Sequence, residues 1–289
     1  MDGNPSVKTD CVWLPDASQK TQAILGVLTS IFVIYGGKYS VKMCACDLIS
    51  GYLILEKAMK SYTITLIRNA LTQENLEGRY LGHTDAPLCP AGRAQLEELI
   101  ASYRYPKAQV VFSSPLRRCL DTAHMIYPEK EIIPIEDMIE YDFGAFDGKT
   151  AEELENHPLF SDWLAGKPDV DPPFGESSAA FGKRICACFE KIVNGMLTSG
   201  VESAAVVTHG GLIMQLMARY ALPGAQAHEW LTPSGCGYTL RITPSIWMTA
   251  RKAEAICEVP EEEHDFDYER ALWGQDPFDE ADAPGDPAE

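Results

Sequence analysis

Short apolar strands alternate with longer helical segments from Ser61 onward, and this alternation constrains the fold more than any other feature of the chain. Three of the strands, residues 62–67, 109–112 and 204–208, are mostly apolar or β-branched, which is typical of strands covered on both faces. Parallel neighbours need a crossover of about a dozen residues, and the helical segments between these strands can supply it. The pattern therefore predicts an α/β sandwich around a largely parallel sheet.

The remaining elements follow from the same periodicities. Residues 131–135 are expected at a sheet edge or a strand end, because Pro134 lacks the N–H that an inner strand donates. Residues 238–242 and 246–256 are expected to form a closing pair of strands. The expected helices are residues 90–100, 116–127, 150–165, 176–198 and 212–220.

The composition excludes several classes of protein. With 289 residues, 46% of them hydrophobic and 23% charged, the chain is neither disordered throughout, nor collagen-like, nor a polytopic membrane protein. The net charge of −18 argues against nucleic-acid binding through a basic face. Much of this charge lies in residues 258–289, which hold 13 acids and one base, so we predict a disordered acidic tail there. Trp273 and Phe278 leave open a short partner-binding motif within it.

The nine cysteines are scattered, without a C-x-x-C pair or a histidine at zinc-finger spacing. This pattern favours free thiols over disulfides or a metal site. Free thiols are typical of a reducing compartment, so we expect a cytoplasmic protein.

The first 60 residues form a predicted N-terminal extension that differs from the rest. Residues 21–37 carry no charge, but the stretch is shorter than the roughly 20 apolar residues of a spanning helix. Three interpretations stay open: a buried or interfacial helix, a marginal membrane anchor, or an extension absent from the native product, since Met59 precedes the first strand. The predicted organisation is thus an extension over 1–60, a globular domain over 61–257 and the tail over 258–289.

Polar residues follow three of the predicted strands. Arg68 and Asn69 follow the first, two serines with Arg118 follow the second, and His209 with two glycines follows the third. The carboxyl ends of parallel strands meet at one edge of a sheet, where function gathers in such folds. We therefore expect these side chains to converge.

The residue types at this edge point to phosphate chemistry. Arginine presents a planar fork that matches phosphate oxygens, so Arg68 and Arg118 with His209 form a candidate phosphate site. Gly210 lies between a strand and a helix, where backbone N–H groups can approach an anion. Glu140, in a separate Glu-Tyr-Asp-Phe-Gly segment, is a candidate general acid for a leaving oxygen.

These residues lie in five blocks, in order, that together resemble the motifs of the histidine phosphatase superfamily. The blocks are Leu66–Leu88, Ser113–Ala123, Glu140–Gly148, Pro173–Ser177 and Val206–Ile213. The resemblance covers about Ser61 to Ile242 and implies a phosphoglycerate-mutase-like, three-layer α/β/α sandwich. The amino-acid sequence of the first block is most similar to the α-ribazole phosphatase-like or broad phosphatase branch. In this family, substrate specificity comes from outside the phosphate pocket, here residues 76–88 and 145–178.

The resemblance also implies a role for each matched position. Arg68 and Asn75 would bind the transferred phosphate, Arg118 and His209 with the Gly210 amide would complete the pocket, and Glu140 would protonate the departing alkoxide. The family's nucleophile is the histidine after the first arginine, which forms a phosphohistidine that water hydrolyses. Neither a metal nor an organic cofactor takes part.

The chain departs from the family at the nucleophile, where it carries Asn69 in place of histidine and Ala70 in place of the usual glycine. An amide nitrogen is delocalised into its carbonyl and does not form the covalent intermediate. Two hypotheses follow. The chain is either a phosphatase for a small phosphorylated metabolite that is impaired at its nucleophile, or a silent pseudoenzyme that binds a phosphorylated ligand or a protein partner.

Overall fold

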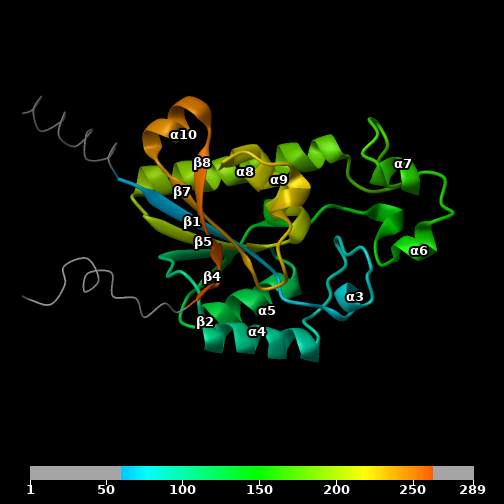
Figure 1. Ribbon diagram of the computed structural model, residues 1–289, viewed down its shortest axis with the longest axis horizontal. Helices are drawn as coiled ribbons and strands as arrows, with labels where there is room; N and C mark the ends of the chain where they lie inside the picture. Colours follow the sequence, from blue (N-terminus) through cyan, green and yellow to red (C-terminus); the bar gives the residue numbers. More distant parts are fainter. Residues whose placement is uncertain (1–59, 263–289) are drawn as a thin grey trace, which may run out of the picture. The chain divides into compact units, whose positions relative to one another are not determined.

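The computed structural model describes residues 60–262, within the second of the chain's two units, Leu55–Glu289. In this part a seven-stranded sheet has helices on both faces (Figure 1). The predictions for residues 21–37 and for most of the acidic tail lie outside the described residues. Among residues 60–262, none of the helices is long and apolar enough to cross a membrane.

The sheet has the strand order β4-β3-β5-β1-β7-β8-β6. The strands β4, β3, β5 and β1 pair in parallel, whereas β7 is antiparallel to both of its neighbours. The prediction of a largely parallel sheet with residues 131–135 at its edge is thus confirmed. The strands are β1 Tyr62–Arg68, β3 Val110–Ser113, β4 Ile132–Pro134, β5 Ser203–Thr208, β6 Ala221–Leu222, β7 Gly237–Ile242 and β8 Ala253–Val259.

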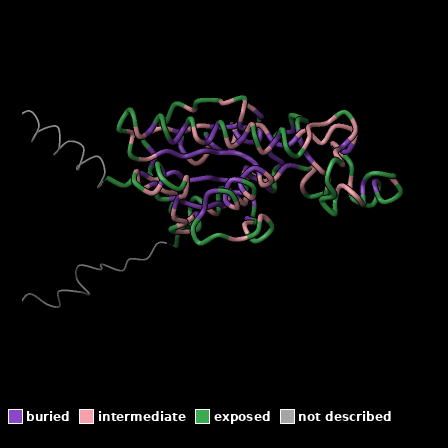
Figure 2. The backbone as a smooth tube through the Cα atoms, turned by 90° about the horizontal axis from the view of Figure 1, so that it is seen from above, coloured by how far each residue is buried: buried purple, intermediate pink, exposed green. Residues whose placement is uncertain are grey.

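Side chains of the central strands alternate between two hydrophobic clusters, one on each face of the sheet. Leu66 and Val206 belong to the cluster under α8, Ser178–Ser199, and α9, Gly210–Tyr220. The next residue of each strand packs on the opposite face, in the cluster that includes residues of α5, Arg117–Ile126. Because both faces are covered, these strands are buried (Figure 2) and show no polar face in the sequence.

The helices form two outer layers. Figure 1 shows α8 and α9 over one face of the sheet, and α4, Pro90–Ser102, with α5, Arg117–Ile126, over the other. This arrangement confirms the three-layer α/β/α sandwich. The remaining short elements are β2 Tyr103–Arg104, α3 Gln73–Leu76, η1 Glu136–Met138, η2 Gly144–Phe146, α6 Ala151–Leu154, α7 Phe160–Leu164, η3 Ala227–Trp230, α10 Pro244–Ala250 and β9 Glu261–Glu262.

The prediction of one helix over residues 150–165 is wrong, because the structure has α6 and α7 with a break between them. Pro158 lies in the break. Proline lacks the N–H of a helical bond and disfavours helical geometry in the preceding residue, so the helix cannot run through it.

The prediction of a strand over residues 246–256 is wrong in its first half. Pro244 occupies the first turn of helix α10, where its missing N–H costs nothing. The helix ends at Ala250, the next residue, Arg251, has a left-handed φ of 51°, and β8 begins only at Ala253.

The secondary structure continues past the predicted domain boundary at residue 257. β8 runs to Val259, which is buried, and β9 then pairs with β2 in a second, two-stranded sheet. The first residues of the predicted acidic tail therefore belong to the globular part.

Candidate functional site

The carboxyl ends of three parallel strands lie side by side in the sheet. Arg68 at the end of β1 pairs with Thr208 of β5, and Ser113 of β3 pairs with the residue before Thr208. The backbone N–H of Asn69 then donates to the Thr208 carbonyl at 2.8 Å. Register alone therefore brings the three polar segments of the sequence to one edge.

His209 is buried and lies between two polar side chains. Its Nε2 is 2.7 Å from Ser114 Oγ, and its Nδ1 is 3.3 Å from Arg118 Nε. Because arginine Nε only donates, Nδ1 must be the unprotonated nitrogen and Nε2 carries the proton. Burial, helped by the charge of Arg118, holds the pKa of His209 well below its ordinary value. The imidazole is thus neutral and points its N–H at Ser114.

Arg118 connects His209 to the loop after α3. Its guanidinium is buried and donates to the carbonyls of Gly82 and Thr84, each at 2.7 Å. The Asp147 carboxylate holds the same loop by accepting from the N–H groups of Gly82 at 2.8 Å and Thr84 at 3.0 Å. Arg118 is therefore fixed in place, with part of its donor capacity committed to the loop.

Arg68 lies against the first turn of α9. A Cβ atom on Gly210 would be 3.2 Å from Arg68 Nε, so glycine allows the helix to begin this close to the guanidinium. Arg68 also donates to the Thr232 carbonyl at 2.6 Å. Burial lowers the pKa of Arg68 while the nearby Glu140 acts in the opposite direction, and an arginine in this setting stays charged.

Glu140 is buried with both carboxyl oxygens bonded. Oε1 accepts from the Tyr141 N–H at 2.8 Å, and Oε2 accepts from the Gly211 N–H at 3.1 Å. Burial raises the pKa of Glu140 above its ordinary value, although these two N–H groups and the arginines oppose the shift. A carboxyl of this kind can hold a proton closer to neutral pH, as a general acid must.

Asn69 is buried beside this group, and its side chain is bonded to its own loop. Its Nδ2 donates to the Ala70 carbonyl at 2.8 Å, and the Ala70 N–H donates to Thr122 Oγ1 at 2.9 Å. Thr122 thus holds the backbone that follows Asn69, a contact that the sequence analysis missed. It is the threonine of the Ser113–Ala123 block, so the motif could have identified Thr122 as a residue near the site.

Asn75 is placed differently from the other predicted phosphate ligands. It forms a capping box with Thr72 at the start of α3, with both bonds at 3.3 Å. No hydrogen bond among residues 60–262 joins Asn75 to Arg68 or His209. The structure therefore brings together Arg68, Asn69, Arg118, Glu140 and His209, called the strand-end cluster below, with Gly210 at its helix.

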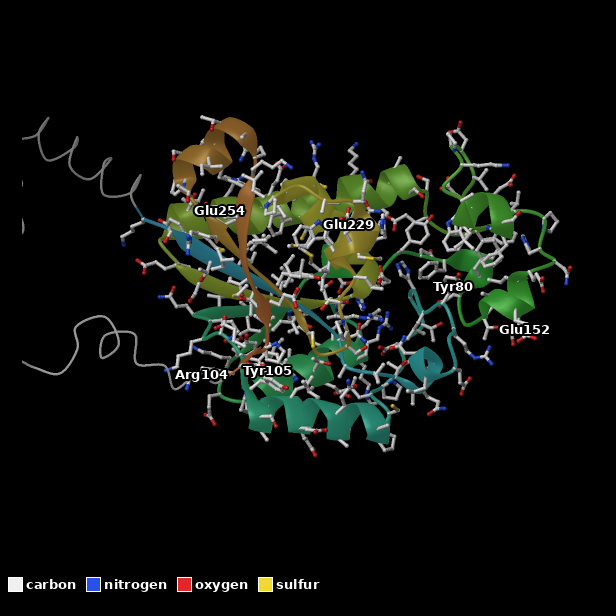
Figure 3. The ribbon with its side chains drawn as sticks, in the orientation of Figure 1. Tyr80, Arg104, Tyr105, Glu152, Glu229 and Glu254 are labelled. Carbon is white, nitrogen blue, oxygen red and sulfur yellow. The ribbon has the colours of Figure 1, made fainter. Side chains whose placement is uncertain are left out.

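The two segments predicted to determine specificity meet in an aromatic cluster. The ring centroid of Tyr80 lies 5.5 Å from those of both Phe143 and Trp163. Figure 3 shows Tyr80 and Glu152 at the end of the domain that carries α6 and α7. One of these segments also reaches the strand-end cluster. His83 Nε2 is 3.0 Å from the Glu140 carbonyl, a contact that the sequence did not predict.

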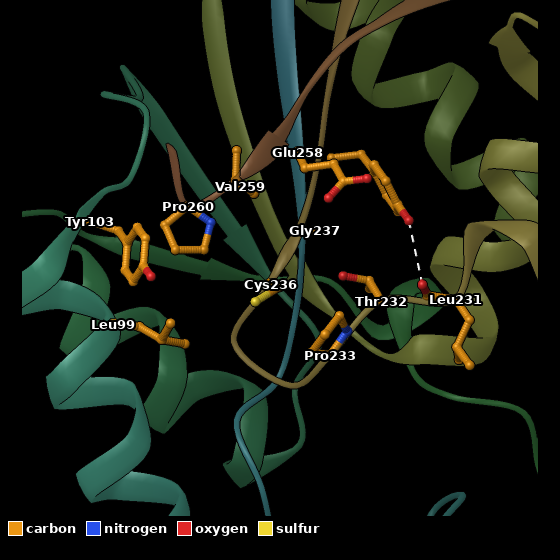
Figure 4. A pocket seen from close by; sticks show the side chains of 11 residues that line it. Leu99, Tyr103, Leu231, Thr232, Pro233, Cys236, Gly237, Glu258, Val259 and Pro260 are labelled. Carbon is orange, nitrogen blue, oxygen red and sulfur yellow. Dashed lines mark hydrogen bonds between the residues drawn. The ribbon is translucent and has the colours of Figure 1, made fainter. Parts of the chain in front are cut away.

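A cavity of about 290 Å³ adjoins the backbone that holds Arg68. Thr232, whose carbonyl accepts from Arg68, lines it together with Cys236, Tyr103 and Glu258 (Figure 4). The Cys236 carbonyl accepts from the Arg68 backbone N–H at 2.8 Å. One loop thus contacts Arg68 and borders this cavity.

The sequence profile of the histidine phosphatase superfamily (branch 1) matches residues 64–252, more than half of the chain. The chain therefore belongs to the histidine phosphatase superfamily. This finding agrees with the resemblance of the five sequence blocks.

Individual relatives agree with this assignment. The chain is 25% identical over 177 residues to the adenosylcobalamin/alpha-ribazole phosphatase of Salmonella typhimurium, covering 59% of this chain and 86% of that one. It is 32% identical over 176 residues to phosphoglycerate mutase-like protein 4 of Arabidopsis thaliana, covering 57% and 74%. The crystal structure of a phosphoglycerate mutase from Bacillus anthracis superposes with a TM-score of 0.53 at 20% identity, over 65% of this chain and 91% of that one. The predicted phosphoglycerate-mutase-like fold is thus confirmed.

Proposed function

We propose that the protein is a phosphomonoester hydrolase of the histidine phosphatase type that acts on a small phosphorylated metabolite and is impaired at its nucleophile. The observation that carries the proposal is the strand-end cluster itself. It combines two arginines, a neutral histidine with a fixed tautomer, and a buried carboxyl with a raised pKa. This set suits phosphate binding together with proton donation to a leaving oxygen.

Each member of the strand-end cluster has a role in this proposal. Arg68 and Arg118 bind the phosphate oxygens, and His209 turns its Nε2–H from Ser114 Oγ to one of these oxygens when the phosphate is bound. Gly210 begins α9, so its N–H lacks an intrahelical acceptor and lies at the positive end of the helix dipole. Glu140 protonates the departing alkoxide. Asn75 Oδ1 accepts from the Thr72 N–H in the capping box, so its Nδ2 is the group that donates to the phosphate.

Asn69 occupies the nucleophile position in this proposal and accounts for the impairment. The hydroxyl and the thiol that contact His209, Ser114 Oγ and Cys119 Sγ, do not replace a nucleophilic histidine. Because His209 donates to Ser114, it cannot also take the Ser114 proton. Burial raises the pKa of Cys119 to about 12, which keeps this thiol protonated at neutral pH.

The second candidate function is a silent phosphate-binding pseudoenzyme. This function is favoured by the Asn69 side chain, because its amide nitrogen donates to the Ala70 carbonyl and is not a nucleophile. The retained Glu140 favours the enzyme, because a binder has no need of a general acid.

The proposal extends to the setting of the reaction. The six cysteines that the described part of the chain contains are free, in keeping with a cytoplasmic protein. The relatives named above include a phosphatase for alpha-ribazole, so a phosphorylated small molecule is the proposed substrate class.

The decisive experiment compares p-nitrophenyl phosphate hydrolysis by the unaltered chain, Asn69→His, and Asn69→His with Ala70→Gly. We expect near-background turnover by the unaltered chain. Restoring histidine should raise turnover by about a hundredfold or more, the usual cost of losing a catalytic group. Rapid-quench labelling should detect a phosphoenzyme in the histidine variants alone.

Two results separate the candidate functions. Absence of turnover in all three proteins, with vanadate still bound by the unaltered chain in calorimetry, would favour the binding protein. A phosphoenzyme in the unaltered chain would show that another residue is the nucleophile, and the proposed site would then be wrong.

A further inference from the structure

The Pro173–Ser177 block of the sequence contributes no residue to the strand-end cluster. Its glutamate, Glu176, pairs with Arg184 on α8 in a two-point ion pair. Arg184 Nε lies 3.0 Å from Glu176 Oε1, and Arg184 Nη2 lies 2.7 Å from Glu176 Oε2. The side chains are only 19% and 16% exposed, so this is a partly buried, two-point contact.

The rest of the Arg184 guanidinium points at the backbone that carries Glu140. Its Nη1 donates to the carbonyls of Asp137 at 2.9 Å and Ile139 at 2.8 Å, and its Nη2 donates to the Glu140 carbonyl at 3.2 Å. One guanidinium therefore holds three carbonyls within four consecutive residues. Among the hydrogen bonds described for residues 60–262, the one other bond to these carbonyls joins His83 Nε2 to the Glu140 carbonyl at 3.0 Å, so the Asp137 and Ile139 carbonyls depend on Arg184.

The backbone around Glu176 holds the other side of the same segment. The Glu176 N–H donates to the Asp142 carbonyl at 3.0 Å, and the Ala145 N–H donates to the Pro173 carbonyl at 2.8 Å. A Cβ atom on Gly175 would be 2.3 Å from the Asp142 carbonyl oxygen, so only glycine permits this approach. Residues before and after Glu140 are thus fixed by one clamp.

We infer that the Arg184–Glu176 ion pair is a positioning device for the general acid Glu140. The Glu140 carboxyl must meet N–H groups from two elements, its own loop and the start of α9, and a displacement of about 1 Å is enough to impair such a site. Glu176 neutralises the charge of Arg184, so this arginine serves the backbone and not the phosphate. The inference rests on the proposed function.

The test uses leaving groups of different basicity in the Asn69→His background. p-Nitrophenolate leaves without a proton, whereas the alkoxide of glycerol phosphate needs one from the general acid. Arg184→Met should lower kcat for glycerol phosphate about tenfold or more and change kcat for p-nitrophenyl phosphate by less than about threefold, since general acids contribute roughly 10²–10⁴. Glu140→Gln gives the upper limit of the effect.

Lys191→Met is the matched control. Lys191 lies on the same helix and pairs with Asp137 at 3.9 Å, but its side chain is 76% exposed. It should leave both substrates unaffected. If Arg184→Met lowers kcat for both substrates equally, the ion pair supports folding alone and the inference is overturned.

A second measurement on the unaltered chain needs no turnover. The Gly211 N–H lies in the first turn of α9, where no intrahelical acceptor exists, and it donates to Glu140 Oε2. Its hydrogen exchange therefore reports whether Glu140 is in place. Arg184→Met should speed this exchange about tenfold or more, approaching the rate in Glu140→Ala, while Lys191→Met should not. Unchanged exchange would overturn the inference, whereas inactivity of Asn69→His on both substrates would count against the proposed function only.

Discussion

Replacing Gly211 by alanine should displace the general acid of the proposed reaction. A Cβ atom at this position would lie 2.8 Å from Glu140 Oε1, closer than these atoms pack, and 3.2 Å from Oε2, which is a tight contact. Glu140 is only 6% exposed, and both of its oxygens are bonded. The carboxyl can therefore move away from the added methyl group only by lengthening or breaking these bonds, that with the Gly211 N–H first.

The expected magnitude follows from two opposing effects. Losing a hydrogen bond to a charged group costs about 1.5–3 kcal/mol. Alanine in place of glycine in a helix restores about 0.5–1 kcal/mol. The net loss in the free energy of unfolding should therefore be about 0.5–2.5 kcal/mol.

Urea denaturation of Gly211→Ala beside Gly195→Ala tests this reasoning. Gly195 lies within α8, and a Cβ atom there would contact nothing within 4 Å, so this control should gain about 0.5–1 kcal/mol. In the Asn69→His background, Gly211→Ala should also lose activity on alkyl phosphates. If the two alanine variants are equally stable, the Glu140 carboxyl is not held as described and the reasoning is refuted.

Two further predictions concern pH and the carboxyl end of the domain. Because the pKa of folded His209 lies well below 6.5, the unfolded chain binds a proton that the folded chain does not as the pH falls through about 6.5. Stability should therefore decrease on acidification, and His209→Gln should flatten this slope in urea denaturation between pH 5 and 8; an unchanged slope would contradict the assignment. Truncation after Cys257 should lower stability more than truncation after Glu262, because Val259 is 2% exposed and pairs with Gly237. Equal denaturation midpoints would show that the end of β8 is dispensable.

Local sequence patterns were sufficient for the central strands and for most of the proposed site. A strand covered on both faces must be apolar along its length, so β1, β3 and β5 are recognisable without a structure. Parallel strands also bring their carboxyl ends to one edge, which is why Arg68, Arg118 and His209 could be grouped from their positions after strands and near helix starts. Glu140 lies outside any strand, and it was assigned to the site from the Glu140–Gly148 motif.

The sequence patterns were insufficient wherever two distant segments decide the outcome. Residues 246–250 have the apolar character of a strand, yet they form α10 because Pro244 begins a helix there. The antiparallel direction of β7 depends on its pairing with β1 and β8, and hydrophobic periodicity carries no direction.

The sequence by itself determined which residue types reach the edge of the sheet, because side-chain chemistry and strand periodicity are local properties. The tertiary structure alone decided the tautomers, the hydrogen bonds and the direction of the pKa shifts of these residues. The His209 tautomer follows from Arg118, 91 residues away in the chain, and the Glu140 carboxyl is bonded by Gly211, 71 residues away. Hydrogen bonds between residues so far apart in the sequence, and the burial of these residues, arise only when the layers pack together. They determine which groups carry protons at the site.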